Sequence, residues 1–302
     1  MTVASASTGI VIPDLVHPVR RIGHRDFDFS RQVAVMAIIN RTPDSFYDRG
    51  ATFELDAAVA SATQAIVDGA DWVDIGGAKF APGPAIPIDE EIERVVPVIE
   101  GLQGSGAIIS VDTFHPAVAL AGIAAGAHII NDTTGVHDPA IADVVADSDA
   151  TLVITHSLAA PRQPYPAPHY TDVVTVVADF LRQRVELAVS RGVPLERIII
   201  DPGHDLNKNT LQTLELTRRL SEITALGLPT LAAVSNKDFI GETLDRERDQ
   251  RVEGSLAAAV FSILQGARIV RMHNVTAAVD AVRMTEAILG FREPAYLRHN
   301  MA

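Results

Sequence analysis

Cysteine is absent from this sequence of 302 residues, which excludes disulfide bonds, thiolate metal sites and cysteine nucleophiles. Basic residues are also few, because 25 Lys and Arg stand against 38 Asp and Glu and give a formal net charge of −13. A chain this acidic repels a phosphate backbone, so we expect no nucleic-acid partner. A small phosphate-bearing substrate remains possible, since a few local cations can outweigh the overall charge.

Long apolar runs are missing as well. No stretch of about 18 apolar residues suggests a membrane span, so we expect no membrane partner. Residues 1–10 have neither the basic end nor the apolar stretch of a signal peptide. The lack of cysteine fits a reducing compartment. These absences together predict a cytoplasmic protein.

The sequence does contain a repeated unit: a short apolar run, a loop, and then a stretch with helical periodicity. Each run is rich in Ile, Val, Leu or Ala, which is typical of a strand buried on both faces. Glycines such as Gly126 and Gly192 stand between a predicted helix and the next strand. The runs are Val33–Ile39, Trp72–Gly76, Ala107–Asp112, Ile129–Asp132, Thr151–His156, Arg197–Asp201, Thr230–Ser235 and Arg268–Met272.

Eight alternating strand and helix units predict a parallel sheet closed into a single-domain TIM (β/α)₈ barrel. An open, doubly wound sheet is the alternative. We expect an N-terminal extension over residues 1–30, the barrel over residues 31–292 and a C-terminal tail over residues 293–302. The extension either covers the bottom of the barrel or stays partly disordered.

Polar residues close the apolar runs, at the strand ends where the active site of such a barrel lies. One group of them suits a flat, nitrogen-rich heterocycle. A carboxylate accepts two parallel N–H bonds, an amide offers one donor and one acceptor, and a Lys donates to a ring atom. Each Asp also has a structural interpretation as the N-cap of the next helix. The group is Asp112, Asn131, Asp201 and Lys237.

A second group, Asn40, Arg271 and His273, suits an anion. Arg binds phosphate oxygens as a fork, and the period of two aims Arg271 and His273 into the same barrel mouth. By the same alternation, Asp132 should point away from the mouth and is interpreted as structural. His156 is interpreted as a core histidine.

Seven segments of the chain, in order, resemble the signatures of dihydropteroate synthases, from about Val33 to Leu289. The family is a TIM barrel, usually a homodimer, that joins 4-aminobenzoate to a dihydropterin carrying a CH₂–pyrophosphate arm. The segments are Asn40–Phe46, Asp74–Gly77 with Pro82 and Gly83, Ser110–Thr113, Ile130–Asp132 with Gly135, Asp201–Gly203, Ser235–Lys237 with Phe239–Gly241, and Arg271–His273.

The resemblance also implies roles for the two groups of residues. The first group would hold the pterin and the second the pyrophosphate, with Mg²⁺ near Asn40. This division agrees with the one drawn from side-chain chemistry. An aromatic amine requires no general base, so none of these residues need be a nucleophile or a base.

The departures from the family pattern cluster around the second substrate. Phe80 and Ala81 stand where the family has Thr and Arg, and Asn236 replaces an Arg in the seventh strand segment. Asp238 stands where the family often has a Ser near the aminobenzoate carboxylate. At 4–5 Å the two carboxylates would repel by about 3–4 kcal/mol at an effective dielectric near 20. These four residues predict an altered second-substrate pocket.

We therefore predict a dihydropteroate-synthase-like protein that binds a pterin and has weak or no synthase activity. A functional synthase of folate biosynthesis is one alternative, and a non-catalytic protein that binds a pterin or a small 4-aminobenzoate-like aromatic is another. Methyl transfer to a corrinoid is disfavoured by Arg271 and His273, because methyl-folate carries no pyrophosphate. An aldolase with Lys237 as Schiff base is the remaining interpretation.

Overall fold

The computed structural model describes residues 10–41, 54–78, 82–163 and 169–299. Within these residues, eight parallel strands pair in the order β8-β7-β6-β5-β4-β3-β10-β9. A bridge between Ile200 and Thr230 joins the two ends of this sheet, which confirms the predicted barrel. The strands are β3 (Ala34–Asn40), β4 (Trp72–Gly76), β5 (Ile108–Asp112), β6 (Ile129–Asp132), β7 (Thr151–Thr155), β8 (Ile198–Asp201), β9 (Leu231–Ala232) and β10 (Ile269–Met272).

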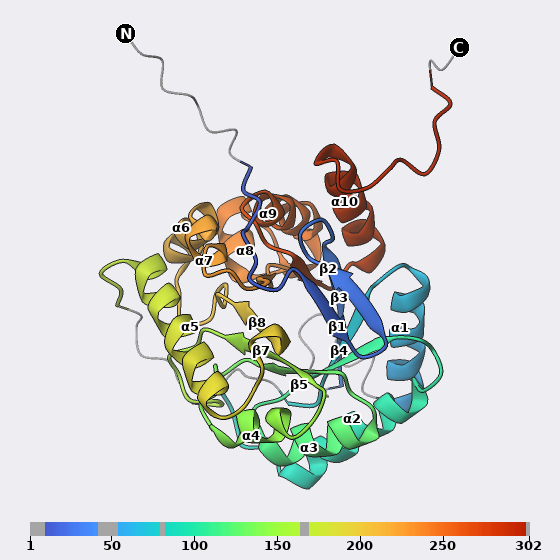
Figure 1. The fold of residues 1–302 in the computed structure, drawn as a ribbon, viewed down its shortest axis with the longest axis vertical. Coiled ribbons are helices and arrows are strands. Elements are labelled where there is room, and N and C mark those ends of the chain that lie inside the picture. The colour runs from blue at the N-terminus through green and yellow to red at the C-terminus, as the bar shows by residue number, and fades with distance from the viewer. Residues whose placement is uncertain (1–9, 42–53, 79–81, 164–168, 300–302) are drawn as a thin grey trace.

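Helices surround the barrel (Figure 1). The longest of the described helices, α5, packs one face against the barrel, since Val174, Val177 and Leu181 are fully buried. None of the described helices has the length and apolar character needed to cross a membrane. The helices are α1 (Leu55–Val67), α2 (Ile88–Gly101), α3 (Pro116–Ala125), α4 (Ala140–Ala146), α5 (Val173–Ser190), α6 (Thr210–Arg218), α7 (Leu220–Thr224), α8 (Asp238–Leu244), α9 (Val252–Leu264) and α10 (Val275–Ile288), with 3₁₀ turns η1 (Leu195–Arg197) and η2 (Arg248–Gln250).

Successive side chains of each strand point alternately toward the helices and into the barrel. The inward side chains near the strand starts form an apolar floor that is fully buried: Met36, Trp72, Ile108, Ile129, Val153, Ile199, Leu231 and Ile269. Two positions further along, the same faces carry polar residues: Asp74, Ser110, Asn131, Asp201 and Arg271. The alternation thus places a polar mouth directly above an apolar floor.

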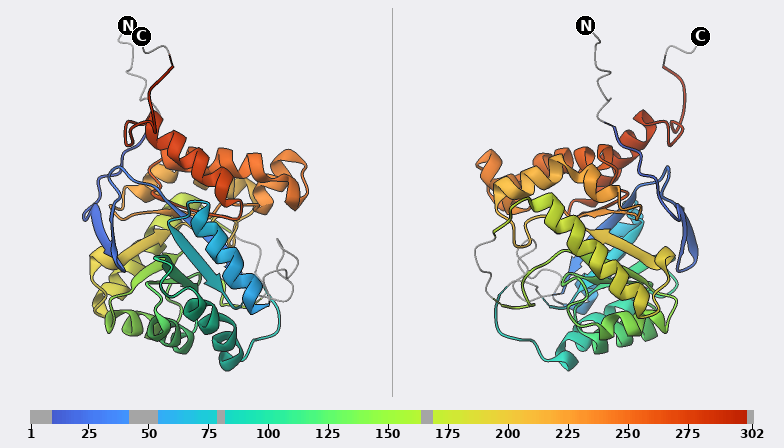
Figure 2. Two further views of the ribbon diagram at one scale, coloured as in Figure 1. Left: turned by 90° about the vertical axis from the view of Figure 1, so that its right-hand side faces the viewer. Right: turned by 60° about the vertical axis from the view of Figure 1, so that its left-hand side comes forward.

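An antiparallel hairpin of β1 (Val19–Ile22) and β2 (Arg25–Asp28) lies across one end of the barrel (Figure 2). Phe27 and Phe29 are fully buried and pack against the Trp72 ring in T-shaped geometry, at centroid distances of 5.4 and 6.3 Å. These aromatic contacts close the bottom of the barrel, opposite the polar mouth. The boundaries given above for the extension, barrel and tail stay predictions.

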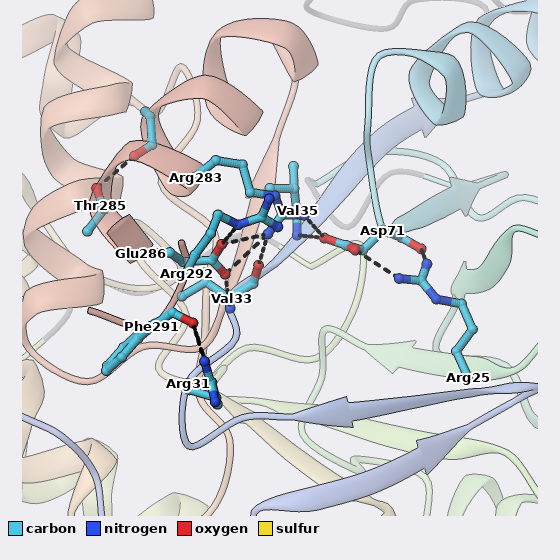
Figure 3. A network of polar contacts seen from close by, with 11 residues as sticks. Arg25, Arg31, Val33, Val35, Asp71, Arg283, Thr285, Glu286, Phe291 and Arg292 are labelled. Atoms are coloured by element: carbon cyan, nitrogen blue, oxygen red, sulfur yellow. Dashed lines mark hydrogen bonds and ion pairs between the residues drawn. The ribbon is translucent and has the colours of Figure 1, made fainter. Parts of the chain in front are cut away.

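A polar network ties this end of the barrel to α10 (Figure 3). The Asp71 carboxylate pairs with Arg25 of the hairpin at 3.2 Å and with Arg283 of α10 at 2.8 Å. Glu286 of α10 accepts the backbone N–H of Val33 at 2.8 Å and pairs with Arg283 at 3.2 Å. Both carboxylates are buried, so each is compensated by charge and by hydrogen bonds.

Candidate functional site

A row of neighbouring residues crosses four strands at the rim of the mouth. Asn40 pairs in register with Gly76, Gly76 with Asp112, and Asp112 with Asn131. Gly76 leaves room between its neighbours, because a Cβ there would lie 3.5 Å from Asn40 Oδ1 and 4.0 Å from Asp112 Oδ2. A residue predicted for the anion and one predicted for the ring therefore lie on either side of the same glycine.

Below this row, Arg271 bridges two carboxylates. Its Nε donates to Asp74 Oδ2 at 2.6 Å, and its Nη2 donates to Asp112 Oδ2 at 2.9 Å. Asn131 Nδ2 donates to the same Asp74 oxygen at 3.0 Å. Asp74 was not predicted to have a role. The signal was a charged residue inside an apolar strand, two positions before Gly76, where alternation aims it into the barrel.

The carboxylates of the mouth are desolvated. Burial raises the pKa of Asp112 to about 7, and the Asp74 charge adds to this rise while Arg271 opposes it. Burial likewise raises the pKa of Asp201, although the Gly203 N–H that donates to Asp201 Oδ1 at 2.7 Å lowers it. Proton binding by these carboxylates is therefore coupled to whatever occupies the mouth.

Lys237 follows β9 and enters the same electrostatic environment. Its Nζ donates to the backbone oxygen of His204 at 2.6 Å. Burial lowers the pKa of Lys237, while the charges of Asp205 and Asp201 raise it. Arg271 and Lys237 both act on Asp201, so the structure brings Asp201 and Lys237 together on the side of the mouth that Arg271 also reaches.

The predicted anion residues lie on adjacent strands. Asn40 ends β3 and Arg271 lies on β10, which pairs with β3. His273 follows β10, and its backbone N–H donates to Ser235 Oγ at 3.1 Å. The His273 ring nitrogen Nδ1 lies 2.9 Å from the same hydroxyl. Ser235 therefore fixes the orientation of this imidazole at the rim.

The residues predicted for the second-substrate pocket differ in burial and in their partners. Asn236 is buried, and its side chain Oδ1 accepts from Ser255 of α9 at 3.2 Å. The Asp238 side chain is 69% exposed and pairs with Arg251 at 2.9 Å and Arg248 at 3.6 Å. Phe80 and Ala81 lie outside the described residues. The roles predicted for all four stay predictions.

A second polar cluster, behind Asp201, was not anticipated. Lys208 Nζ contacts His156 Nδ1 at 2.9 Å and donates to the backbone oxygens of Gly203 and Leu206. Burial lowers the pKa of Lys208 to about 7 and that of His156 to about 2, so the imidazole is neutral and accepts from Lys208. These bonds hold the loop after β8 against the end of β7. The polar run from His204 to Lys208 was the available signal.

A family model described as pterin binding enzyme matches residues 36–273, which span the whole barrel from β3 to β10. The chain belongs to the dihydropteroate synthase family. Its fold is therefore the pterin-binding barrel that the sequence motifs indicated, and the resemblance stated above is confirmed.

The relatives of this synthase-like chain include mycobacterial proteins named inactive dihydropteroate synthase 2. The one from Mycobacterium tuberculosis is 45% identical over 267 residues, which cover 86% of this chain and 84% of the relative. The one from Mycobacterium leprae is 44% identical over 267 residues and is 92% covered. The dihydropteroate synthase of Escherichia coli K12 is 37% identical over 261 residues, 86% of this chain and 93% of the relative.

Solved structures of dihydropteroate synthases superpose on the barrel. The Xanthomonas albilineans enzyme with 4-aminobenzoic acid has a TM-score of 0.83 and 41% identity, over 90% of this chain and 98% of that one. The Yersinia pestis enzyme with a sulfonamide drug has a TM-score of 0.86 and 35% identity, over 91% of this chain and all of that one.

The side chains of this synthase-like chain also indicate how a metal ion could be held. Among residues 10–41, 54–78, 82–163 and 169–299, no group of three or more His, Asp or Glu side chains could hold a metal. Asn40 contributes one amide oxygen at the rim, which is the hard donor type that Mg²⁺ binds. This donor set fits a metal held jointly with substrate phosphates rather than one held by the protein alone.

Proposed function

We propose that this chain binds a dihydropterin in the barrel mouth and condenses it with 4-aminobenzoate weakly or not at all. The observation that carries the pterin half is an unpaired acceptor. Asn131 Oδ1 is buried and has no hydrogen-bond partner among the described residues, although the Asn131 side chain is held by Asp74. A buried acceptor without a donor is costly, and a ring N–H would satisfy it.

The ring would be held by the first group of residues. Asp112 is 17% exposed, so its carboxylate can accept parallel N–H bonds from the amino-pyrimidine edge of a pterin. Asn131 adds an acceptor beside it, and Asp201 with Lys237 supplies an acceptor and a donor from the opposite strands. These groups would fix the ring so that its CH₂ arm points toward Arg271.

The pyrophosphate arm would lie against Asn40, Arg271 and His273. In the reaction the amine nitrogen bonds to the methylene carbon, the electron pair of the breaking C–O bond leaves with pyrophosphate, and the nitrogen then loses one proton to water. A fixed guanidinium and an imidazole N–H stabilise that developing negative charge. When bound, Mg²⁺ would add Lewis-acid stabilisation of the same charge, with Asn40 as its protein ligand.

Weak or absent condensation is supported by two observations. The family's Thr and Arg are replaced by Phe80 and Ala81, which removes a hydroxyl and a cation from the second loop. Relatives at 44–45% identity carry the name inactive dihydropteroate synthase 2. A functional second-substrate pocket would need other groups to take over the lost contacts.

One observation favours the alternative of a functional synthase. The Asp238 carboxylate is turned outward and compensated by Arg251 and Arg248, so it would repel a substrate carboxylate less than a bare charge would. The predicted repulsion of about 3–4 kcal/mol at 4–5 Å is then an upper bound. In that case the synthase loss rests on Phe80, Ala81 and Asn236.

The test combines a titration with a turnover assay on the full chain. Calorimetry with the dihydropterin pyrophosphate and Mg²⁺ should give a saturable binding signal. The same protein, given 4-aminobenzoate as well, should form product far more slowly than an active dihydropteroate synthase assayed beside it. Product at the rate of the active enzyme would establish the alternative, and a silent titration would reject pterin binding. Binding with no product from any amine would favour the non-catalytic role.

The resemblance supports three further proposals: a homodimer, Mg²⁺ dependence and a cytoplasmic location. Sedimentation of the purified chain tests the first. Mg²⁺ dependence is tested with a chelator, which should lower the affinity for the pyrophosphate-bearing ligand but not for the bare pterin. Fractionation of cells that express the chain tests the third.

A further inference from the structure

Asp74 lies in the middle of β4, below the rim, between the residues proposed for the ring and those proposed for the anion. Its side chain is fully buried at 0% exposure, whereas that of Asp112 is 17% exposed. Asp112 therefore lies nearer the opening of the mouth than Asp74. We infer that Asp74 is a positioning residue that fixes Asn131 for the ring and Arg271 for the anion through one shared carboxylate oxygen. This inference rests on the proposed pterin binding.

The first half of the argument concerns the orientation of the Asn131 amide. An ionised carboxylate can only accept hydrogen bonds. The amide must therefore present Nδ2 to Asp74 Oδ2, over 3.0 Å, and its Oδ1 must face the other way. That Oδ1 is buried and has no partner among the described residues. Asp74 thus dictates that Asn131 offers the ring an acceptor rather than a donor.

The second half concerns the Arg271 guanidinium. Its Nε donates to the same Asp74 Oδ2 at 2.6 Å, and its Nη2 donates to Asp112 Oδ2 at 2.9 Å. A pterin that takes the Asp112 carboxylate competes with Arg271 for this oxygen. Asp74 lies deeper in the mouth than Asp112, so it keeps its bond to Arg271 when Asp112 is occupied. The cation then remains in the mouth, with N–H groups available to the phosphate arm.

Electrostatic interactions also link Asp74 to Arg271 and Asp112. Arg271 lies among carboxylates on β4, β5 and β8, and the Asp74 and Asp112 charges favour its protonated form more than Asp201 does. Asp74 in turn opposes ionisation of Asp112. Loss of Asp74 should therefore release the guanidinium toward Asp112 and make Asp112 easier to ionise. A residue that only filled space in the core would have neither effect.

The experiment uses two probes on the full chain with Mg²⁺: 6-hydroxymethyl-dihydropterin, which presents the ring alone, and its pyrophosphate ester, which adds the arm. The first readout is a double-mutant cycle on the ring probe. Asp74→Ala and Asn131→Ala should each weaken binding about tenfold, the effect of losing one buried hydrogen bond. Because Asp74 acts through Asn131, the double variant should lose about tenfold as well, not a hundredfold.

The second readout is the affinity gained by adding the arm, taken as the ratio of the two dissociation constants. Asp74→Ala should reduce this ratio, because Arg271 loses the anchor that keeps it in the mouth. Asn131→Ala should leave the ratio unchanged, since Asn131 contacts Asp74 and not Arg271. General distortion of the pocket would lower both ratios together.

A conservative variant covers the case in which Asp74→Ala does not fold. In Asp74→Asn the amide oxygen can still accept from both partners, so the ring probe should bind within about threefold of wild type. The pH midpoint of ring binding should move to lower pH, because the negative charge that opposes ionisation of Asp112 is gone. Asp132→Asn is the matched control for the ratio: within the described part of the chain this buried carboxylate accepts from Thr134 and the Val136 N–H, on the loop side of β6, so the ratio should be preserved.

The outcomes separate this inference from the proposed function. If wild type binds neither probe, pterin binding itself is rejected and the inference falls with it. If wild type binds both probes but the losses at Asp74 and Asn131 multiply, or the arm ratio is unaffected in Asp74→Ala, only the positioning role is overturned. An unshifted pH midpoint in Asp74→Asn would overturn it in the same way.

Discussion

Arg271 donates from Nη2 to Asp112 Oδ2 across 2.9 Å, although the two residues are 159 positions apart in the sequence. This bond links a residue proposed for the pyrophosphate with one proposed for the pterin ring. A bound ring and Arg271 would share the same carboxylate. Occupation of the ring site should therefore change the affinity for the anion, and the reverse must hold by thermodynamic linkage.

The state of Asp112 predicts how pterin affinity depends on pH. Burial raises its pKa to about 7; Asp74, Glu91 and Asp132 oppose ionisation, and Arg271 favours it. The ring needs the ionised carboxylate, so affinity should be full above pH 8 and fall toward tenfold per pH unit below pH 6. Calorimetry from pH 5.5 to 8.5 measures this slope, and Asp112→Asn should flatten it. Affinity that rises on acidification would contradict the assignment.

Asp201→Ala and Lys237→Ala should each lower pterin affinity on the order of 100-fold, because each leaves a polar ligand group unpaired in a desolvated mouth. Titrations with the bare pterin measure the loss, and thermal unfolding monitors whether each variant is folded. Glu253→Ala, an exposed change on α9, serves as the control and should bind like wild type. Undiminished affinity in both folded variants would place the pterin elsewhere.

The neutral His156 predicts acid sensitivity of the fold. Its pKa is lowered from 6.5 to about 2 by burial and by Lys208, so below pH 6.5 the unfolded chain binds a proton that the folded chain excludes. Stability from this group is complete above pH 6.5 and should fall by about 1.4 kcal/mol per pH unit below it. His156→Asn keeps an acceptor for Lys208 but cannot titrate.

The measurement is the free energy of unfolding in urea at pH 4, 5 and 6. His204 contributes in the same direction, because burial lowers its pKa to about 3, while the buried carboxylates act in the opposite direction. The difference between His156→Asn and wild type in the slope of unfolding free energy against pH gives the contribution of His156. His17→Asn, at an exposed position, should keep the wild-type slope. Equal slopes in all three proteins would show that His156 is protonated in the folded state.

Asp71→Ala should lower the free energy of unfolding by about 3 kcal/mol, because it leaves the Arg283 guanidinium and the Val35 N–H without their buried acceptor. Asp26→Ala removes an ion pair to Arg21 in which both side chains are more than 60% exposed, and should change stability by only about 0.5 kcal/mol. Urea unfolding of the two variants compares them. Similar losses would mean that the network in Figure 3 is not what holds the hairpin.

The fold could be predicted largely because buried parallel strands leave uninterrupted apolar runs, and because strand ends are marked by a change to polar residues. The run at Thr230–Ser235 was predicted too long, since only Leu231–Ala232 forms the strand. The hairpin of β1 and β2 was not predicted. Its residues are mostly charged, and it depends on the distant contact of Phe27 and Phe29 with Trp72.

Within the site, alternation along the strands identified which side chains enter the mouth but not which of them meet. The bond between Arg271 and Asp112 joins β10 and β5, which β3 and β4 separate in the sheet, so it depends on the curvature of the barrel. Asp74 was quoted in a motif but given no role, because it lies within an apolar run rather than at its end. The direction of the Asp238 side chain depends on Arg251, the residue that precedes α9. The sequence around Asp238 does not indicate this pairing.

Restoring the family residues at three positions of the second-substrate pocket should raise synthase activity. The variant Phe80→Thr, Ala81→Arg and Asp238→Ser returns a hydroxyl and a cation and removes a negative charge. One charged hydrogen bond to the substrate carboxylate should speed condensation at subsaturating 4-aminobenzoate by about tenfold or more. Initial rates at fixed dihydropterin pyrophosphate measure the gain.

The exposed and paired state of Asp238 divides this gain between the substitutions. Asp238→Ser alone should change the rate less than about threefold, because Arg251 and Arg248 already compensate the carboxylate. Phe80→Thr with Ala81→Arg should therefore supply most of the increase. A large gain from Asp238→Ser alone would mean that its charge acts on the substrate despite those partners. No gain in the triple variant would place the deficit outside these three positions.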